Sequence, residues 1–495
     1  MKRAYLVCAV VAAWMPAPAV LADEALIKEV IKTLNDNKIT VNATDESKSY
    51  KILFDAYLEM SKPPFVVGPE FNLATIHPKM PTWSAVSGWA ESNSKMAQAI
   101  LKCKDKVMIG LPYGREKVDA AYLKAGLFCD IGVGGSLREN EFPYMTAQDT
   151  IAAFATAEIY RLMEVGQVQQ ALDLAIAHCF VQRQFCDRDF LVEKLHSIGL
   201  LSEVMSNLRD VFYLYQDKAT SDQLAKIAIQ EIPYLRPDRG RLFMPEADRV
   251  VAEALIKEVF SDKTANPDPE KFSETFADIQ SKHAPLTRFG AARRWRMIVP
   301  IHGSLDASLH QLKLIYDDWW RRWRIDAYDD EMLRYPTQFS RTNSIRYAAV
   351  MFSAQDVEVL FQVRNRLIAE VNGTAIVAGL CAYRRNYNSY PDKTEKTYTE
   401  FDKKRSDSDP YFPVEVEGGL QKVPGPFHYM FTERRQSVNT QYGPLAIEKG
   451  QAFLYSVGRD HEDNRGAQHT DDGTIGDMVI WPPIKSLARA QGKLE

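Results

Sequence analysis

The spacing of apolar residues changes once along this chain, and that change constrains the fold more than any other feature. Apolar residues recur every three or four positions in segment after segment, from residues 24–34 and 50–60 to 364–387. This spacing is typical of amphipathic helices. Beyond Pro391 the chain is rich in glycine, proline and charge, with short strand-like runs such as YFPVEVEGG and AFLYSV. We therefore expect a mainly α protein: an irregular α-helical body followed by a small C-terminal α+β domain with an antiparallel sheet.

The helical part is predicted to contain an N-terminal helical region at 23–145 and a helical body at 146–362, followed by the α+β domain at 363–495. The glycine-rich stretch CDIGVGGSLRENEFP separates the first two. Residues 146–185 have the pattern of a helical hairpin with Gly166 at its corner. No similar glycine corner follows one repeat later, so a regular repeat array is not predicted. Further helices are predicted at 84–102, 200–216, 221–231, 246–260 and 270–282.

The first residues indicate export. Met1–Arg3 is a short basic start, Ala4–Met15 is apolar, and Val20 and Ala22 occupy the small-residue positions of a cleavage site. We expect residues 1–22 to be a signal peptide and the mature protein to be exported, periplasmic or extracellular. No later segment approaches the roughly twenty apolar residues of a membrane-spanning helix, so no transmembrane segment is expected after signal removal.

Charge and cysteine content narrow the possibilities further. A net charge of −4 over 495 residues gives no reason to expect nucleic acid as a partner. An oxidising compartment permits disulfides, and Cys103–Cys129 and Cys179–Cys186 are the pairs closest in sequence. An odd number of cysteines leaves at least one free thiol. The cysteines that follow the signal peptide are Cys103, Cys129, Cys179, Cys186 and Cys381.

Residues 304–330 are predicted to form a long helix with one apolar face that includes Trp319 and Trp323. Three arginines nearby, Arg321, Arg322 and Arg324, leave stacking on a nucleic acid or sugar open. The simpler interpretation is that the tryptophans are core residues and the arginines lie at the rim or pair with Asp317 and Asp318.

A loop near the C-terminus concentrates acidic side chains between the strand-like runs AFLYSV and DMVIW. Only Arg459 and Arg465 offset them locally, so folding the loop tightly crowds like charges unless a cation or solvent separates them. Calcium suits such a loop because it takes six to eight oxygen ligands in irregular geometry. The alternative is a solvated acidic loop that binds nothing. The acidic residues are Asp460, Glu462, Asp463, Asp471, Asp472 and Asp477.

The loop is not an EF-hand, because Arg465 occupies the glycine position and strands are predicted on both sides. His461 and His469 raise a transition metal as another alternative, although they lie eight residues apart without a cysteine nearby.

Two segments together, TAIVAGLCAYRRNYNSYP and AFLYSVGRDHEDN with GDMVIW, resemble the soluble head of the major pseudopilins of type II secretion. In that family a helix, a small sheet and a calcium loop follow one another. The resemblance implies Asp460 and Asp477 as calcium ligands, with Ser456 and the carbonyl oxygen of Leu454 as further candidates. Asp463, Asp471 and Asp472 are local alternatives.

A pseudopilin begins with its own membrane helix, whereas here the matching segments follow a long helical body, so assembly into a pilus is not implied. The whole chain also resembles exported helical proteins of planctomycete-type bacteria, through LKCKDKVMIGLPYG, the helical middle and YSVG-x-D. That resemblance implies no known activity.

The sequence carries no G-x-x-x-x-G-K-[ST], H-E-x-x-H, G-x-S-x-G or C-x-x-C motif. His302, Ser304 and Asp306 have the residue types of a catalytic triad, but their close spacing favours the start of a helix. Whether the protein is an enzyme is left open. We expect an exported, non-catalytic cell-envelope interaction or structural protein with a calcium-stabilised tail and envelope proteins or polymers as partners. The alternative is a hydrolase of envelope or extracellular polymer with a site between body and tail.

Overall fold

The structure is a computed structural model. It describes residues 24–36, 44–67, 71–235, 242–260, 266–276, 295–403, 406–416, 422–470 and 473–494. The predicted signal peptide at 1–22 lies outside these ranges, and so do Asp471 and Asp472 of the acidic loop. The prediction of a mainly α protein with a small C-terminal α+β part is confirmed.

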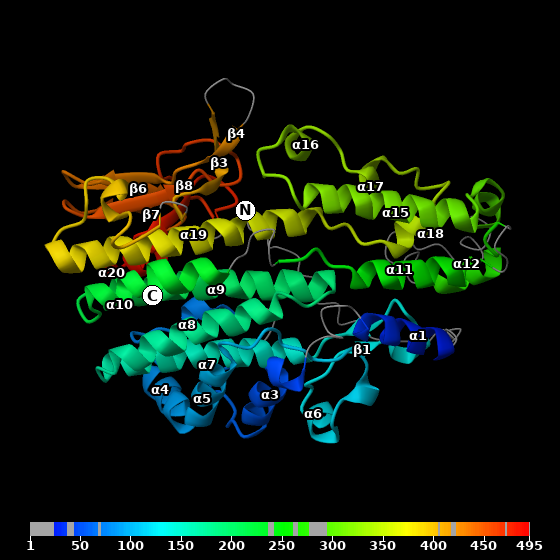
Figure 1. Ribbon diagram of the computed structural model, residues 1–495, viewed down its shortest axis with the longest axis horizontal. Coiled ribbons are helices and arrows are strands. Elements are labelled where there is room, and N and C mark those ends of the chain that lie inside the picture. Colours follow the sequence, from blue (N-terminus) through cyan, green and yellow to red (C-terminus); the bar gives the residue numbers. More distant parts are fainter. Residues whose placement is uncertain are drawn as a thin grey trace.

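Two long helices, α9 (Leu191–Leu214) and α19 (Glu358–Tyr387), pack along each other through the middle of the molecule (Figure 1). Both bury residues on nearly every face, which is expected of helices enclosed by other elements. Arg209 of α9 donates to Oγ1 of Thr374 at 2.7 Å and forms an ion pair with Glu370 at 2.5 Å. The C-terminal strands lie on the side of α19 away from α9.

Below α9 in Figure 1, the hairpin of α7 (Tyr144–Glu164) and α8 (Val168–Phe185) forms the next layer. Gly166 turns the corner with φ of 81°, a left-handed conformation that favours glycine, so the predicted hairpin is confirmed. Of the N-terminal helices, α4 (Trp83–Ser92) packs on α7 and α5 (Ser94–Cys103) packs on α8, while α3 (Tyr50–Leu58) packs on α5. Helix α1 (Glu24–Asn35) packs on α11 (Ala247–Glu258) instead. The remaining N-terminal elements are α6 (Ala120–Lys124) and the short strands β1 (Asp130–Ile131) and β2 (Asn140–Glu141).

The single helix predicted at 84–102 is wrong, because the chain breaks between α4 and α5 at Asn93. The Asn93 side chain accepts a hydrogen bond from the backbone N–H of Ser61 at 3.0 Å and donates to the carbonyl of Trp89 at 2.6 Å. These bonds hold the buried residue Asn93 in place. Its backbone has φ of −110° and ψ of 34°, which lies outside the helical region. The contact with Ser61 joins residues far apart in sequence, so helical periodicity does not reveal the break.

A second group of helices lies at the other end of α9 and α19 (Figure 1). Its main members are α11 (Ala247–Glu258) and α15 (Leu305–Arg322). Trp319 and Trp323 are 0% and 1% exposed, so their prediction as core residues is confirmed. The shorter helices of this group are α12 (Pro269–Thr275), α16 (Asp330–Leu333), α17 (Gln338–Arg341) and α18 (Ala348–Ser353). Helix α10 (Ser221–Lys226), followed by a π-helical turn at Ile227–Glu231, instead packs on α19 toward the end of the molecule that carries the sheets.

In the described residues of the C-terminal part, antiparallel strands form three separate sheets. The central one has the order β5-β8-β9, with Tyr429 opposite Leu454 and Leu454 opposite Trp481. A final helix, α20 (Ile484–Ala490), was not predicted. The strands are β3 (Asp409–Glu415) paired with β4 (Lys422–Gly425), β5 (His428–Phe431), β6 (Gln436–Thr440) paired with β7 (Gly443–Ile447), β8 (Ala452–Ser456) and β9 (Met478–Trp481).

Body and tail share one large hydrophobic core that extends from Val30 of α1 to Trp481 of β9. The boundary predicted between residues 362 and 363 falls inside α19, which begins earlier than the 364 expected from its apolar pattern. Among the helices of the described ranges, none combines the length and the apolar character that crossing a membrane requires.

The disulfide pairs considered from sequence spacing are wrong. All five cysteines of the described part are free and buried. Cys179 and Cys186 lie seven residues apart at α8, about 10 Å along the axis, which is too far for a disulfide. Cys103 contacts the carbonyl of Ser49, whereas Cys129 accepts from Arg188.

Candidate functional site: the loop between β8 and β9

The acidic loop, residues 457–477, is held at both ends by paired strands. Ser456 at the end of β8 lies opposite Met478 at the start of β9, and all residues of both strands are buried. Gly458 has φ of 73°, and a Cβ built on it would lie 2.5 Å from the carbonyl oxygen of Gly476. Only glycine allows the two ends of the loop to come this close.

Asp477 closes the loop at its base. Its side chain is 0% exposed. Oδ1 accepts a hydrogen bond from the backbone N–H of Asn464 at 3.1 Å, and Oδ2 accepts one from Gly466 at 2.5 Å. Burial raises the pKa of Asp477 to about 6, the two backbone donors oppose this rise, and the nearby carboxylates Asp463 and Asp460 add to it. The loop therefore folds around a buried carboxylate with two other carboxylates close by.

The structure brings Asp460 and Asp477 to the same residue. Asn464 donates its backbone N–H to Asp477, and its side-chain amide donates to Oδ2 of Asp460 at 3.1 Å. The other oxygen of Asp460 accepts from the backbone N–H of Glu462 at 3.1 Å. Arg465 follows with φ of 58°, the left-handed conformation that glycine supplies at the equivalent turn of an EF-hand loop. Asp460, Glu462 and Asn464 thus alternate along a tight turn and present oxygen-bearing side chains.

Asp463 lies in the same turn but makes contacts toward the sheet. Its Oδ1 accepts from the Tyr455 hydroxyl at 3.0 Å and from the backbone N–H of Arg465 at 2.8 Å. Its Oδ2 lies 3.6 Å from Nδ1 of His428, whose ring stacks on Tyr455. Asp463 therefore fixes the outer part of the loop to β5 and β8.

The hydroxyl of Ser456 forms its hydrogen bond with a residue of another strand. Its hydroxyl donates to Oδ1 of Asp409 on β3 at 2.8 Å, and the N–H of Val457 donates to Oδ2 at 3.1 Å. Asp409 is fully buried, and burial raises its pKa to about 6. Sequence reasoning missed Asp409 because it lies far from the loop in sequence. Leu454 is a core residue of β8 with a fully buried side chain.

The two loop histidines are separate. Nδ1 of His461 lies 2.6 Å from the carbonyl oxygen of Tyr411, so it donates there, whereas His469 is exposed and its backbone N–H pairs with Ile475. Across the part of the chain that the structure describes, no three His, Cys, Asp or Glu side chains gather as a metal-binding group.

A second polar cluster, which the sequence did not reveal, surrounds Glu193 at the start of α9. The Glu193 carboxylate is fully buried and accepts from the hydroxyls of Tyr113 and Tyr144, both at 2.8 Å, and from Nε of Arg188 at 2.8 Å. The guanidinium of Arg188 lies over the Tyr113 ring at 4.0 Å. Because each carboxylate oxygen has donors, this cluster joins the N-terminal layer to α9 rather than offering a reactive group. In the sequence, the run CDRDFLVE, residues 186–193, contains both Arg188 and Glu193, but Tyr113 and Tyr144 lie far from it.

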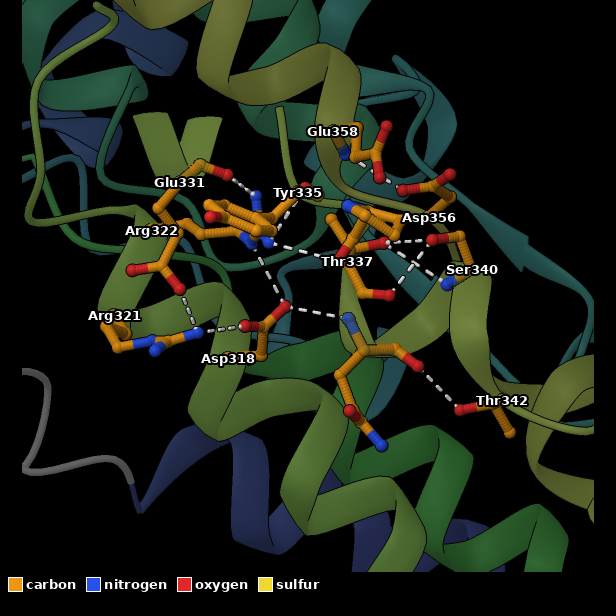
Figure 2. Close-up of polar contacts among 12 residues, drawn as sticks. Asp318, Arg321, Arg322, Glu331, Tyr335, Thr337, Ser340, Thr342, Asp356 and Glu358 are labelled. Carbon is orange, nitrogen blue, oxygen red and sulfur yellow. Dashed lines mark hydrogen bonds and ion pairs between the residues drawn. The ribbon is translucent and has the colours of Figure 1, made fainter. Parts of the chain in front are cut away.

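The arginines of α15 are held by internal contacts (Figure 2). Asp318 accepts from Nη2 of Arg321 at 2.6 Å and from Nε of Arg322 at 3.1 Å, so the predicted pairing with Asp318 is confirmed. Arg322 is 3% exposed and also donates to the carbonyl of Tyr335, while Arg324 lies over the Trp320 ring. The cluster fixes the 330–342 segment to α15.

His302, Ser304 and Asp306 form the start of a helix, as the simpler interpretation predicted. Ser304 caps α15 by accepting from the N–H of Ala307 at 3.3 Å. His302 is buried, and its Nε2 accepts from the N–H of Ala349 at 3.1 Å. Both contacts are structural.

Comparison with protein-family models, curated proteins and solved structures finds no match for this chain. The resemblance to pseudopilin heads stays a prediction that rests on the residues quoted above.

Proposed function

We propose that this chain is an exported cell-envelope interaction or structural protein whose C-terminal loop, residues 457–477, is stabilised by calcium. The observation that carries the proposal is the relation of Asp460 and Asp477 to Asn464. One residue holds both carboxylates at the base of a loop whose ends are fixed by buried strands.

The electrostatics of the loop favour a cation. Asp477 is buried, and the neighbouring Asp460 and Asp463 make its ionisation still less favourable. A divalent cation near these carboxylates would lower their mutual repulsion and stabilise their charged forms. The available donors are all oxygens, from Asp460, Asp477, Glu462 and Asn464 together with backbone carbonyls, and hard cations such as calcium prefer that set.

The contacts between body and tail support a non-catalytic role over the hydrolase alternative. Trp481 of β9 is fully buried and packs edge-to-face on Tyr213 of α9 at 5.6 Å. Ser486 of α20 donates to Asp210 of α9 at 2.5 Å, and Arg489 donates to the carbonyl of Ala74 at 2.6 Å. Side chains fill this part of the interface. A hydrolase of envelope or extracellular polymer with its site between body and tail would need a cleft there.

Thermal melts in millimolar calcium and in chelator test the proposal. Binding to the native state alone raises the midpoint by mass action, and sites of extracellular proteins have Kd values of about 10⁻⁴–10⁻³ M. We expect a midpoint higher by a few degrees with calcium than with chelator, and a smaller rise with magnesium. An unchanged midpoint at millimolar calcium would remove the calcium part of the proposal.

Two variants test whether the calcium-dependent rise of the melting midpoint comes from the loop. Asp460→Asn keeps the size of the exposed side chain and removes its charge, so we expect most of the calcium-dependent rise to disappear. Glu433→Gln is the matched control, because Glu433 is an exposed acid of the same tail outside the loop. A calcium response that Asp460→Asn leaves intact would assign the ion to another place.

Export is tested separately by expressing the full chain in a bacterial host and determining the N-terminus of the protein in each fraction. We expect the exported chain to begin at Asp23. A chain that stays in the cytoplasm with residues 1–22 attached would contradict the export part of the proposal.

A further inference from the structure

A cavity of about 120 Å³ lies where three distant parts of the chain meet, well away from the acidic loop in sequence. One wall is formed by Leu137, Arg138 and Asn140, the last of which is the first residue of β2. The second is α11, and the third is the end of α18 with the residues after it. Helices α11 and α18 pack against each other at the end of the molecule opposite the sheets (Figure 1).

The size of the cavity limits its occupant. An enclosed space of roughly 150 Å³ accepts a six-carbon ring. The present cavity of about 120 Å³ therefore holds a molecule of about six to eight heavy atoms, or several waters. The apolar part of its lining is provided by Leu137, Val251, Leu255 and Phe352.

The polar lining is rich for so small a space: a guanidinium, a carboxylate, two carboxamides and a hydroxyl. The hydroxyl belongs to Ser353, which is 8% exposed, and within the described residues its Oγ has no hydrogen-bond partner. A buried hydroxyl without a partner costs free energy, so a water or a ligand group beside it is favourable. The polar residues are Arg138, Asn140, Asp248, Ser353 and Gln355.

Asp248 supplies the acceptor. Its side chain is 6% exposed, and Oδ2 accepts from the N–H of Leu191 at 2.7 Å, which fixes the carboxylate at the start of α9. Burial raises its pKa to about 7, and the neighbouring carboxylates of Asp189 and Glu193 contribute to the rise. An ammonium group of a ligand would compensate this buried carboxylate.

Arg138 supplies the cation at the other side. Its Nη1 lies 3.5 Å from the carbonyl oxygen of Thr275, and its guanidinium lies over the Phe276 ring at 5.6 Å. These contacts orient a group with five N–H donors in a planar fork, which matches a carboxylate.

We infer that this cavity binds a small zwitterion, a free amino acid of about six to eight heavy atoms, with its carboxylate at Arg138 and its ammonium at Asp248. The carboxamides of Asn140 and Gln355 and the hydroxyl of Ser353 provide the remaining polar contacts. A bound amino acid joins the N-terminal region, α11 and α18, and so stabilises the helical body. This site is independent of the calcium loop.

Calorimetry and thermal melts on the full chain test the site. The probes are L-alanine, L-serine and L-proline at millimolar concentration. Propionate and propylamine each keep one of the two charged groups, glycerol keeps neither, and L-tryptophan exceeds the cavity. We expect at least one of the three small amino acids to bind and to raise the midpoint. We expect propionate and propylamine to bind the cavity at least about tenfold more weakly than the best of these amino acids, because each lacks one charge-assisted contact.

Two variants that leave the helix packing in place locate the binding. Arg138→Gln removes the cation, and we expect the affinity for the best amino acid to fall by roughly tenfold to a hundredfold. Ser353→Ala removes the hydroxyl and should weaken binding less. Arg334→Gln is the matched control, because Arg334 is an exposed arginine that does not line the cavity.

Three results would overturn the inference: no millimolar binding by any of the three amino acids, equal binding by glycerol, or an affinity that both Arg138→Gln and Ser353→Ala leave unchanged. Each variant is checked for its native circular dichroism spectrum first. If Arg138→Gln does not fold, Gln355→Leu replaces it, because Gln355 is exposed and its loss removes a polar contact without disturbing the core.

Discussion

Gly373 of α19 lies so close to Ile480 of β9 that a Cβ built on Gly373 would be 2.8 Å from Cγ2 of Ile480. Gly379 lies further along α19, and a Cβ built on it would be 2.8 Å from the carbonyl oxygen of Phe401. The tail therefore packs on α19 at positions where the helix has no side chain. Helix α19 joins body and tail, and its glycines allow β9 and the segment around Phe401 to approach the helix closely.

The first prediction compares two helical glycines. Gly373→Ala forces a methyl group against the buried Ile480, and overpacking of this kind costs about 1–3 kcal/mol. Gly199→Ala in α9 meets nothing within 4 Å, so the helix propensity of alanine should stabilise by about 0.5–1 kcal/mol. Chemical denaturation measures both changes, and equal signs would contradict the close approach at Gly373.

The second prediction concerns the buried pair at the start of α9. Arg188→Met leaves the fully buried Glu193 without its cation, which costs about 3–5 kcal/mol. The control is Lys95→Met, because Lys95 and Glu59 form an ion pair with side chains 73% and 57% exposed. Exposed pairs contribute about 1 kcal/mol or less. Denaturation midpoints distinguish the two, and a small loss for Arg188→Met would mean that the two tyrosine hydroxyls alone satisfy Glu193.

Most helices could be predicted from sequence because their apolar periodicity is local. The hairpin of α7 and α8 and the long α15 follow directly from spacing and from Gly166. The break at Asn93 could not be predicted, since the contact with Ser61 that holds it is non-local. The same holds for α20, which is short and is fixed by its contact with Asp210 of α9.

The candidate loop was found from its composition, but its contacts were not. The sequence pointed to Asp460 and Asp477 together, and the structure joins them through Asn464. Nothing in the sequence indicated that the Ser456 hydroxyl would donate its hydrogen bond to Asp409 of another strand. Side-chain pairing across strands depends on register, and no spacing rule within one loop supplies that information.

The third prediction is a pH dependence that one buried carboxylate causes. Asp402 is 1% exposed, its Oδ1 accepts from the N–H of Lys403 at 2.6 Å, and its Oδ2 has no partner among the described residues. Burial raises its pKa to about 7. Between about pH 4 and pH 7 the unfolded chain therefore loses this proton first, so stability falls as the pH rises, by up to about 4 kcal/mol in total.

Asp402→Asn cannot ionise, so we expect it to remove that part of the decline and to be more stable than the unmodified chain at about pH 8. Urea denaturation at about pH 4, 6 and 8 measures the slope. Asp392→Asn is the control, because Asp392 is exposed and a hydrogen bond from Lys396 lowers its pKa. Parallel pH profiles for the unmodified chain and Asp402→Asn would show that Asp402 stays charged in the fold.

The last prediction concerns the five free thiols. Each is buried, and burial raises the pKa values of Cys103, Cys186 and Cys381 to about 12, so the reactive thiolate is rare at neutral pH. We expect none of the five to react with a thiol reagent in the native chain within minutes and all five to react in concentrated guanidinium chloride. Ser94→Cys, at an exposed position of α5, is the positive control and should react at once. Reducing agent should leave the melting midpoint unchanged, since the five cysteines of the described residues form no disulfide that would constrain the unfolded chain. A mass lower by two hydrogens for each pair, with fewer than five thiols released on denaturation, would mean that a disulfide forms and that the packing around these cysteines differs from the one described.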